Sequence, residues 1–252
     1  MDLWTKCQGI NHITRLQATA WRLVEAQYVT ATRKLVDSLD EQEILEELIE
    51  STKPPISKEF FGLHPLLYTS FRYPPLKYGS RFGTRYQHSL WYGSLELSTS
   101  MAEKAYYQFN FLRASKADFG IVELWLTAFS VDIKTARGVQ LTKPPFTEYQ
   151  PTISSPTTYQ ISQQLGSAMR KANIEAFNYQ SARDPKQGVN MALFTPKVFA
   201  RKNPNEQSLQ SWQCVATDKR VEFIRSSAMT AETQSFPVEL FLVDGTLPFP
   251  AY

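Results

Sequence analysis

Residues 71–107 read FRYPPLKYGSRFGTRYQHSLWYGSLELSTSMAEKAYY, and the character of the chain changes along this stretch. A loop with two adjacent prolines and several arginines, tyrosines and glycines comes first. The apolar run 89–92 then predicts a short buried strand, in which Trp91 and Tyr92 point to opposite sides. The spacing of apolar residues over 99–111 predicts a helix. The stretch therefore places a strand and a helix directly behind a loop of unusual composition.

Further along the chain, strand-like runs outnumber helical ones. We expect a strand-like run at 66–68, strands at 121–129, 176–179 and 191–194, a helix at 159–173, and hairpin-like pieces at 214–224 and 238–243, the last closed by Asp244-Gly245. The proline-rich stretch 144–156 lacks periodicity and is predicted to be a surface loop. Because strands and helices do not alternate strictly, an α+β fold is favoured over a doubly wound sheet.

Towards the N-terminus, residues 11–52 are interpreted as helical, since apolar residues recur there at helical spacing. Residues 38–41 have the spacing of a capping box and indicate a second helix start. Pro54-Pro55 ends this acidic helix, because proline lacks the N–H group and clashes with the preceding turn. We therefore expect an N-terminal helical extension at 1–59 and a main domain at 60–252. The extension either packs as a helical hairpin or contacts a partner or a second copy.

Composition excludes several classes of protein. The 252 residues are 42% hydrophobic and 20% charged, as in ordinary globular proteins, with a net charge of +3. This charge is too small to indicate nucleic acid as an obligatory partner. Cys7 and Cys214 are too few and too far apart for a disulfide scaffold or a zinc site, so a reduced, cytoplasmic setting is expected. No apolar run is long enough for a secretory leader or a membrane span.

Most catalytic signatures are absent. The sequence contains neither a phosphate loop nor a dinucleotide-binding G-x-G-x-x-G turn, and it has no nucleophile elbow. His12, His64 and His88 are the only histidines, and none belongs to a metal-binding motif, so no metal is expected.

The loop at 71–85 permits one kind of chemistry. Guanidinium groups donate paired, charge-assisted hydrogen bonds to phosphate, and tyrosine rings provide flat faces for a base or a pyridine ring. Gly79 and Gly83 allow the backbone to approach a ligand closely, and Glu103 adds one acid early in the following helix. The residues alone leave two interpretations open. One is a nucleotide site, and the other is a basic surface loop whose arginines pair with carboxylates.

Several separated motifs resemble those of the RES domain family, the toxins of RES–Xre toxin–antitoxin pairs. These motifs are FRYPPLKYGSRFG at 71–83, LWYGS at 90–94, MAEKAYY at 101–107 and FNYQSARDPKQGVNMALF at 177–194. Arg81, Tyr92 and Glu103 are evenly spaced, as the family's arginine, tyrosine and glutamate are. Ser181 resembles the family's serine, and Arg72-Tyr73 resembles its earlier arginine–tyrosine pair. The gap from Arg72 to Arg81 is short for the family, which leaves open which arginine is the principal one.

The resemblance implies a fold similar to that of ADP-ribosyltransferases, with a mixed β-sheet core and flanking helices. It also implies NAD as the substrate. In this interpretation Glu103 stabilises the positive charge that develops on the ribose, and Arg72 and Arg81 bind the diphosphate. Tyr92, with Tyr73, packs on the nicotinamide or its ribose, and Ser181 donates a hydrogen bond nearby. Four further residues have two interpretations each. Arg85 and Arg183 either belong to the site or only balance charge at its rim. Asn190 either caps a turn or contacts the ligand, and Glu123 is either a second acid in the site or faces solvent at a strand edge.

The resemblance further implies a growth-inhibiting toxin that cleaves the nicotinamide–ribose bond of NAD. Its acceptor is water, inorganic phosphate or a protein side chain, and the last case makes it an ADP-ribosyltransferase. An Xre-type antitoxin is the implied partner, nucleic acid is contacted only through that complex, and a homodimer is a further alternative. A catalytically inactive binding module is the competing hypothesis.

Overall fold

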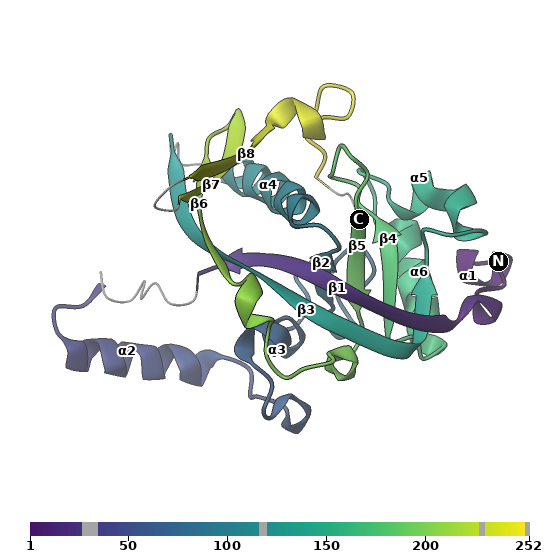
Figure 1. Ribbon diagram of the computed structural model, residues 1–252, viewed down its shortest axis with the longest axis horizontal. Coiled ribbons are helices and arrows are strands. Elements are labelled where there is room, and N and C mark those ends of the chain that lie inside the picture. Colours follow the sequence, from purple (N-terminus) through teal and green to yellow (C-terminus); the bar gives the residue numbers. More distant parts are fainter. Residues whose placement is uncertain (27–34, 116–119, 227–229, 250–252) are drawn as a thin grey trace.

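A single large sheet organises the protein (Figure 1). The computed structural model describes residues 1–26, 35–115, 120–226 and 230–249. The strands are β1 (Thr14–Glu25), β2 (Trp91–Ser94), β3 (Val122–Gln140), β4 (Ala176–Gln180), β5 (Val189–Leu193), β6 (Gln210–Ala216), β7 (Arg220–Ser226) and β8 (Ala231–Pro237). Their order is β1-β2-β5-β4-β3-β6-β7-β8, and β1 also pairs with β3. The first five strands therefore close a ring, and β6, β7 and β8 extend the sheet from β3.

The prediction of a helix from residue 11 onward is wrong for residues 14–25, which form β1. This strand pairs antiparallel with the long β3, from Thr14 opposite Gly138 to Glu25 opposite Leu126. Leu16 and Ala20 are buried against the sheet's own core. A spacing of four residues places two side chains on one face of a helix and also on one face of a strand, so the pattern fits both. Pairing with β3 decides between them.

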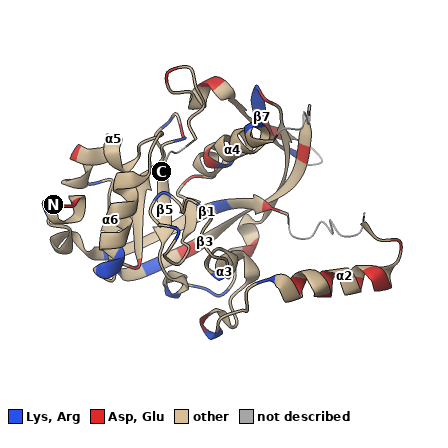
Figure 2. Ribbon diagram, turned by 180° about the vertical axis from the view of Figure 1, so that it is seen from behind, with Lys and Arg blue, Asp and Glu red and all other residues tan. Residues whose placement is uncertain are grey.

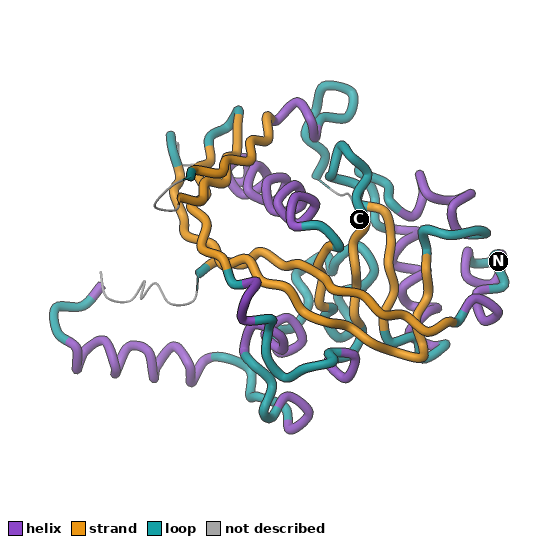
Figure 3. Tube along the Cα trace, viewed as in Figure 1, coloured by secondary structure: helices purple, strands orange, loops and turns teal. Residues whose placement is uncertain are grey.

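The second half of the predicted extension is helical. Helix α2 (Leu39–Thr52) starts at the expected capping box, in which Glu41 N–H donates to Ser38 Oγ at 3.1 Å and Ser38 N–H donates to Glu41 Oε2 at 3.3 Å. None of its residues is buried, and it projects from the body (Figures 1 and 3). The part of the predicted helix at 27–34 lies outside the described residues. Residues 1–59 thus contain both a strand of the main sheet and a projecting helix.

Of the five body helices in the described part of the chain, three cover the sheet. The helices of the body are α1 (Leu3–Lys6), α3 (Pro65–Arg72), α4 (Leu97–Ala114), α5 (Gln150–Ile153) and α6 (Gln160–Lys171). Helix α4 packs on β1, β7 and β8, and its Tyr106 and Phe109 belong to a hydrophobic cluster shared with β6, β7 and β8. Helix α6 packs beside β4, and α3 buries Leu67 against β1 and β2. The predicted α+β class, with a mixed sheet and flanking helices, is confirmed.

Residues 66–68 are helical, and the prediction of a strand-like run there is wrong. They lie in α3, which begins with Pro65 in its first turn, where proline's missing N–H group costs nothing. The imidazole Nδ1 of His64 accepts a hydrogen bond from the Leu66 N–H at 3.2 Å and caps this end. A run of three residues is too short to reveal a period.

The proline-rich stretch 144–156 is also not a plain surface loop. It contains a short 3-10 helix, Phe146–Tyr149, followed by α5. Phe146 and Ile153 are fully buried and pack in the core beneath α6. Isolated apolar residues between prolines carry no periodic signal, so sequence alone did not indicate this burial.

At the C-terminal end, the hairpin predicted at 214–224 is confirmed as β6 and β7. The second hairpin-like piece predicted at 238–243 is wrong, because these residues are mostly the 3-10 helix Val238–Phe241, and β8 is the strand that continues the sheet from β7. The predicted turn is present, because Val243 and Thr246 form a bridge around Asp244 and Gly245. Both turn residues have positive φ, +50° and +73°, which suits an Asp-Gly turn.

Candidate active site

The predicted acid lies in a pocket where the ring of strands meets α4. The pocket has a volume of about 300 Å³. Its walls come from β1, the 80–81 loop, β2, α4, β4 and β5. They comprise Arg22, Leu23, Ser80, Arg81, Tyr92, Gly93, Ser94, Ser100, Glu103, Lys104, Tyr107, Tyr179 and Asn190. Segments far apart in sequence therefore meet at one carboxylate.

Glu103 lies in the second turn of α4 and is half-buried. Ser181 Oγ donates a hydrogen bond of 2.7 Å to Glu103 Oε1. The Ser181 hydroxyl oxygen also accepts hydrogen bonds from the N–H groups of Arg183 at 3.1 Å and Asp184 at 3.0 Å. A hydroxyl has one proton to donate, so these two acceptor bonds direct it towards the carboxylate. Ser181 thus holds Glu103 in one orientation.

Asn190 holds the same oxygen from another side. Its Nδ2 donates to Glu103 Oε1 at 2.6 Å, and its Oδ1 accepts from Ser94 Oγ at 2.7 Å. Ser94 and Asn190 are cross-strand partners on β2 and β5, so the strand register sets this chain of hydrogen bonds. Both readings of Asn190 from sequence, a turn cap or a ligand contact, missed its contact with the acid.

Arg81 is buried behind the acid. Its Nη1 donates to the carbonyl oxygen of Ser155 at 2.8 Å, and its guanidinium lies 4.7 Å from the ring centroid of Tyr159. Burial by itself lowers the pKa of Arg81, but three neighbouring tyrosines and the carboxylate of Glu103 together outweigh it and raise the pKa. Arg81 is therefore a fixed cation beside the carboxylate.

The loop that carries Arg81 is fixed by α6. Gln163 Nε2 donates to the carbonyl oxygens of Tyr78 at 3.1 Å and Ser80 at 3.0 Å. Gly166 approaches so closely that an added Cβ would lie 2.0 Å from the carbonyl oxygen of Phe82. Glycine is needed at this contact because a methyl group has no room.

Tyr92 lines the pocket and is tied to the same loop. Its hydroxyl lies 2.9 Å from Ser80 Oγ and accepts a hydrogen bond from the Phe82 N–H at 3.1 Å. Burial raises the pKa of Tyr92 to about 12, so the phenol is neutral at physiological pH. Trp91 points the other way on β2 and is fully buried, as strand alternation predicts.

Arg72 and Tyr73 lie outside this pocket. The Arg72 Nη2 donates to Glu50 Oε1 at 2.7 Å, and its Nε donates to the Pro54 carbonyl oxygen at 2.6 Å. Tyr73 is exposed, with its ring 5.9 Å from the Arg72 guanidinium. Arg72 ends α3 and joins that helix to α2. The structure thus brings Arg81, Tyr92, Glu103 and Ser181 together but places the Arg72-Tyr73 pair elsewhere.

Arg22 lines the pocket from β1 and was missed from sequence, because residues 14–25 were interpreted as a separate helix. Its guanidinium lies 5.2 Å from the ring centroid of Trp91. Within the described residues, its Nη1 is buried without a hydrogen-bond partner. Burial lowers the pKa of Arg22 to about 10, so the side chain stays cationic at neutral pH. The alternation of apolar and polar residues along 16–20 is the signal that could have predicted a strand here, and with it the position of Arg22 on the sheet.

The other candidates have structural positions. The guanidinium of the buried Arg183 lies 3.5 Å from the Tyr106 ring centroid and donates to the Pro156 carbonyl oxygen at 2.9 Å. Arg85 is exposed beside Tyr86. Glu123 is exposed and accepts from Gln213 at 3.2 Å, which confirms the solvent-facing interpretation.

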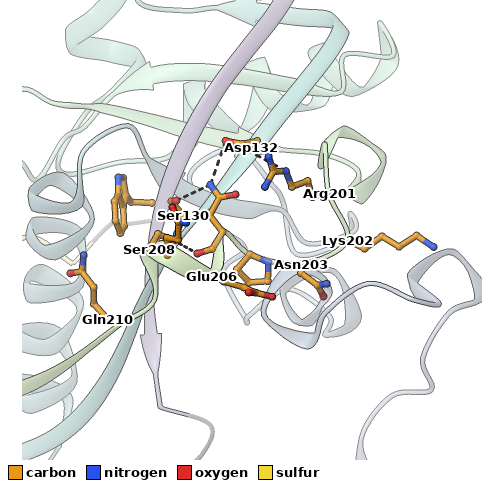
Figure 4. Close-up of a pocket in the computed structure, with 12 residues that line it drawn as sticks. Ser130, Asp132, Arg201, Lys202, Asn203, Glu206, Ser208 and Gln210 are labelled. Carbon is orange, nitrogen blue, oxygen red and sulfur yellow. Dashed lines mark hydrogen bonds and ion pairs between the residues drawn. The ribbon is translucent and has the colours of Figure 1, made fainter.

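A larger pocket of about 830 Å³ lies near the 201–210 segment (Figure 4). Its polar groups bond largely to one another, as when Asn205 Nδ2 donates to Ser130 Oγ at 3.1 Å and Ser208 Oγ donates to the Asn205 carbonyl at 2.6 Å. Within residues 1–26, 35–115, 120–226 and 230–249, no group of three His, Cys, Asp or Glu side chains is placed to hold a metal ion. Helices of the described part of the chain lack the combination of length and apolarity that crossing a membrane requires.

The fold and pocket define a mixed-sheet protein with one carboxylate in a pocket that two arginines also line. The family model of the RES domain matches residues 59–216, more than half of the chain, and the protein belongs to the RES domain family. The matched range starts after β1 and so excludes Arg22. Among solved structures, a chain of the M. tuberculosis MbcT–MbcA toxin–antitoxin complex is similar, with 15% identity and a TM-score of 0.44, over 81% of this chain and 89% of that chain. No curated protein matches the sequence.

Proposed function

We propose that this RES-domain protein is the toxin of a toxin–antitoxin pair and that it cleaves the nicotinamide–ribose bond of NAD. The observation that carries the proposal is the carboxylate of Glu103, held on one oxygen by Ser181 and Asn190 in a pocket that also contains Arg81 and Arg22. A fixed anion beside fixed cations suits a substrate that joins a cationic sugar–base linkage to a diphosphate.

The reaction needs few protein groups. The nicotinamide of NAD is a cation while it is attached to the ribose. When the bond from its ring nitrogen to the ribose C1′ breaks, the electron pair goes to the ring, which leaves as a neutral molecule without a proton. Positive charge then develops on the ribose. With water as the acceptor, oxygen bonds to C1′, one proton is released and ADP-ribose forms. Glycoside hydrolysis usually needs two carboxylates, but this leaving group makes one sufficient.

Glu103 has the central role in this proposal. A preorganised anion stabilises the charge that develops on the ribose, because its orientation costs no reorganisation during the reaction. The hydrogen bonds from Ser181 and Asn190 provide that preorganisation. The ring of Tyr92 lines the same pocket and is the proposed surface for the nicotinamide or its ribose.

Two arginines of the pocket are the proposed diphosphate ligands. Arg81 uses one guanidinium nitrogen on the Ser155 carbonyl, and a guanidinium has five donors in all. Arg22 provides a second, half-buried cation from β1. Its position supports Arg22, in place of Arg72, as the second arginine, because Arg72 is bound to Glu50 and Pro54.

Product analysis tests the proposal. Purified protein is incubated with NAD, with and without inorganic phosphate, and the products are separated by chromatography. Nicotinamide with ADP-ribose indicates hydrolysis, and a phosphorylated ADP-ribose indicates phosphorolysis. Label transferred to protein indicates an ADP-ribosyltransferase. If NAD is not consumed and does not raise the melting temperature at millimolar concentration, the chain is an inactive module and the proposal is wrong.

We further propose that α2 contributes to a contact with an Xre-type antitoxin or a second copy of the chain, in the cytoplasm where NAD and the antitoxin meet. Figure 2 shows acidic residues along this projecting helix. Ile44 and Leu48 are 59% and 60% exposed on it, although a solvated helix seldom keeps such an apolar face uncovered. Its acidic face suits a partner with basic side chains around an apolar groove.

A further inference from the structure

A second cavity adjoins Arg22 on the α3 side of β1. Its volume is about 700 Å³. Helix α3, strands β1 and β3, and the start of β6 form its walls. The lining residues are Arg22, Val24, His64, Pro65, Leu66, Thr69, Ser70, Thr127, Leu209, Gln210 and Ser211. Arg22 lines this cavity and also the pocket of Glu103, so one residue borders both.

Two buried polar atoms of this second cavity lack partners. Within the described part of the chain, neither Arg22 Nη1 nor Ser70 Oγ makes a hydrogen bond, although both atoms are shielded from solvent. Buried polar groups in folded proteins nearly always have a partner, since an unpaired one loses its hydration without compensation. An unpaired guanidinium nitrogen and an unpaired hydroxyl in one cavity indicate a ligand with an anionic group and further hydrogen-bonding groups.

The sizes of the two cavities fit the two halves of a dinucleotide. Small-molecule sites usually have volumes of about 300–1,000 Å³. The pocket of Glu103, at about 300 Å³, is at the lower end of that range and suits the nicotinamide riboside half alone. The second cavity is more than twice as large. Val24, Leu66 and Leu209 provide apolar walls for a purine, and Thr69 and Gln210 provide polar groups at its edge.

We propose that the second cavity binds the AMP half of the dinucleotide, with Arg22 at the diphosphate between the two halves. The assignment rests on the proposed NAD cleavage. It predicts that the enzyme distinguishes NAD from nicotinamide mononucleotide, which has the same scissile bond but lacks the AMP half.

Two substitutions, Thr69→Trp and Leu209→Trp, test the proposed AMP site, because these residues line different walls of the second cavity. Thr69 is exposed and Leu209 is 48% exposed, so neither substitution disturbs the core. Each indole fills the second cavity. We expect each variant to raise the KM for NAD about tenfold, the effect of losing one well-placed ligand contact, with kcat/KM for nicotinamide mononucleotide unchanged. The matched control is Leu76→Trp, at a residue that is 81% exposed and outside both cavities, and it should leave both substrates unaffected.

Binding of AMP separates this inference from the proposed function, because it needs no catalysis. Calorimetry should show AMP binding to the wild type and to Leu76→Trp, and weaker binding to both cavity variants. If NAD is cleaved but AMP binds all four proteins equally, or none of them, the second cavity is not the AMP site and the cleavage proposal stands. If AMP binds as expected but NAD is not cleaved, the AMP site is supported and the proposed reaction fails.

Discussion

The hydroxyl of Ser181 donates a 2.7 Å hydrogen bond to the carboxylate of Glu103, although 78 residues separate the two in sequence. Glu103 lies on α4, and Ser181 directly follows β4. The backbone N–H groups of Arg183 and Asp184 bind the Ser181 oxygen and fix its direction. The serine therefore acts on the reaction through the acid that it orients.

Ser181→Ala should lower kcat for NAD with little change in KM. A hydrogen bond to a charged group contributes about 1.5–3 kcal/mol, which corresponds to a loss of about 10- to 100-fold. Ser162→Ala is the matched control, since Ser162 is also buried and, within the described residues, its hydroxyl bonds only to the Tyr159 carbonyl, at 3.1 Å. Steady-state kinetics of both variants provide the comparison. Equal kcat values for Ser181→Ala and Ser162→Ala would show that Ser181 does not orient Glu103 for the reaction.

Arg22→Met and Arg72→Met distinguish the two candidates for the second diphosphate arginine. Methionine retains much of the apolar length and removes the charge. Arg22→Met should raise the KM for NAD about 10- to 100-fold, the effect of losing a charge-assisted contact, because Arg22 lines the pocket. Arg72→Met should leave this KM unchanged and loosen α2, since Arg72 bonds to Glu50 and Pro54. The reverse ranking of KM values contradicts the assignment.

Gly166→Ala should disturb the loop that carries Arg81. The added methyl group would lie 2.0 Å from the Phe82 carbonyl oxygen, so α6 and the loop must separate. Overpacking of this kind costs about 1–3 kcal/mol of folding free energy. For a chain of this size, that lowers the melting temperature by about 2–4 °C per kcal/mol. NAD cleavage should fall as well. Gln164→Ala, at an exposed position on the same helix, is expected to change neither quantity.

Ile44→Glu with Leu48→Glu tests α2 as a contact surface. Both side chains are exposed, so the double variant should fold and cleave NAD normally. Its complex with the antitoxin, or its dimer, should weaken, because charge replaces the apolar face. Size-exclusion chromatography with light scattering measures both assemblies. If the complex with the antitoxin and the dimer both form as in the wild type, α2 is not part of either interface. Deletion of residues 1–59 is unsuitable for this test, because it also removes β1 from the sheet.

Periodicity identified the elements whose apolar residues follow a single period. Helices α4 and α6 and strands β4 and β5 lie where the sequence predicts them. Strand β1 was missed because Leu16 and Ala20 satisfy both a helical and a strand spacing, and only pairing with β3 separates the two. The burial of Phe146 was missed because it depends on distant segments that have no local signal.

The candidate site, like the fold, was predicted from the sequence only in part. Motif resemblance selected Arg81, Tyr92, Glu103 and Ser181, and the structure places the other three near the carboxylate of Glu103. The position of Asn190 beside that carboxylate follows from its pairing with Ser94, and strand register cannot be read from one sequence.

The central claim is that one anion at residue 103 stabilises the transition state for NAD cleavage. Glu103→Gln retains the shape and the acceptor oxygen and removes the charge, so it tests this claim most directly. The rate of nicotinamide release from NAD should fall about 30- to 1,000-fold, from the loss of about 2–4 kcal/mol of electrostatic stabilisation, with the melting temperature unchanged. Nicotinamide release at the wild-type rate by the folded variant would contradict the account.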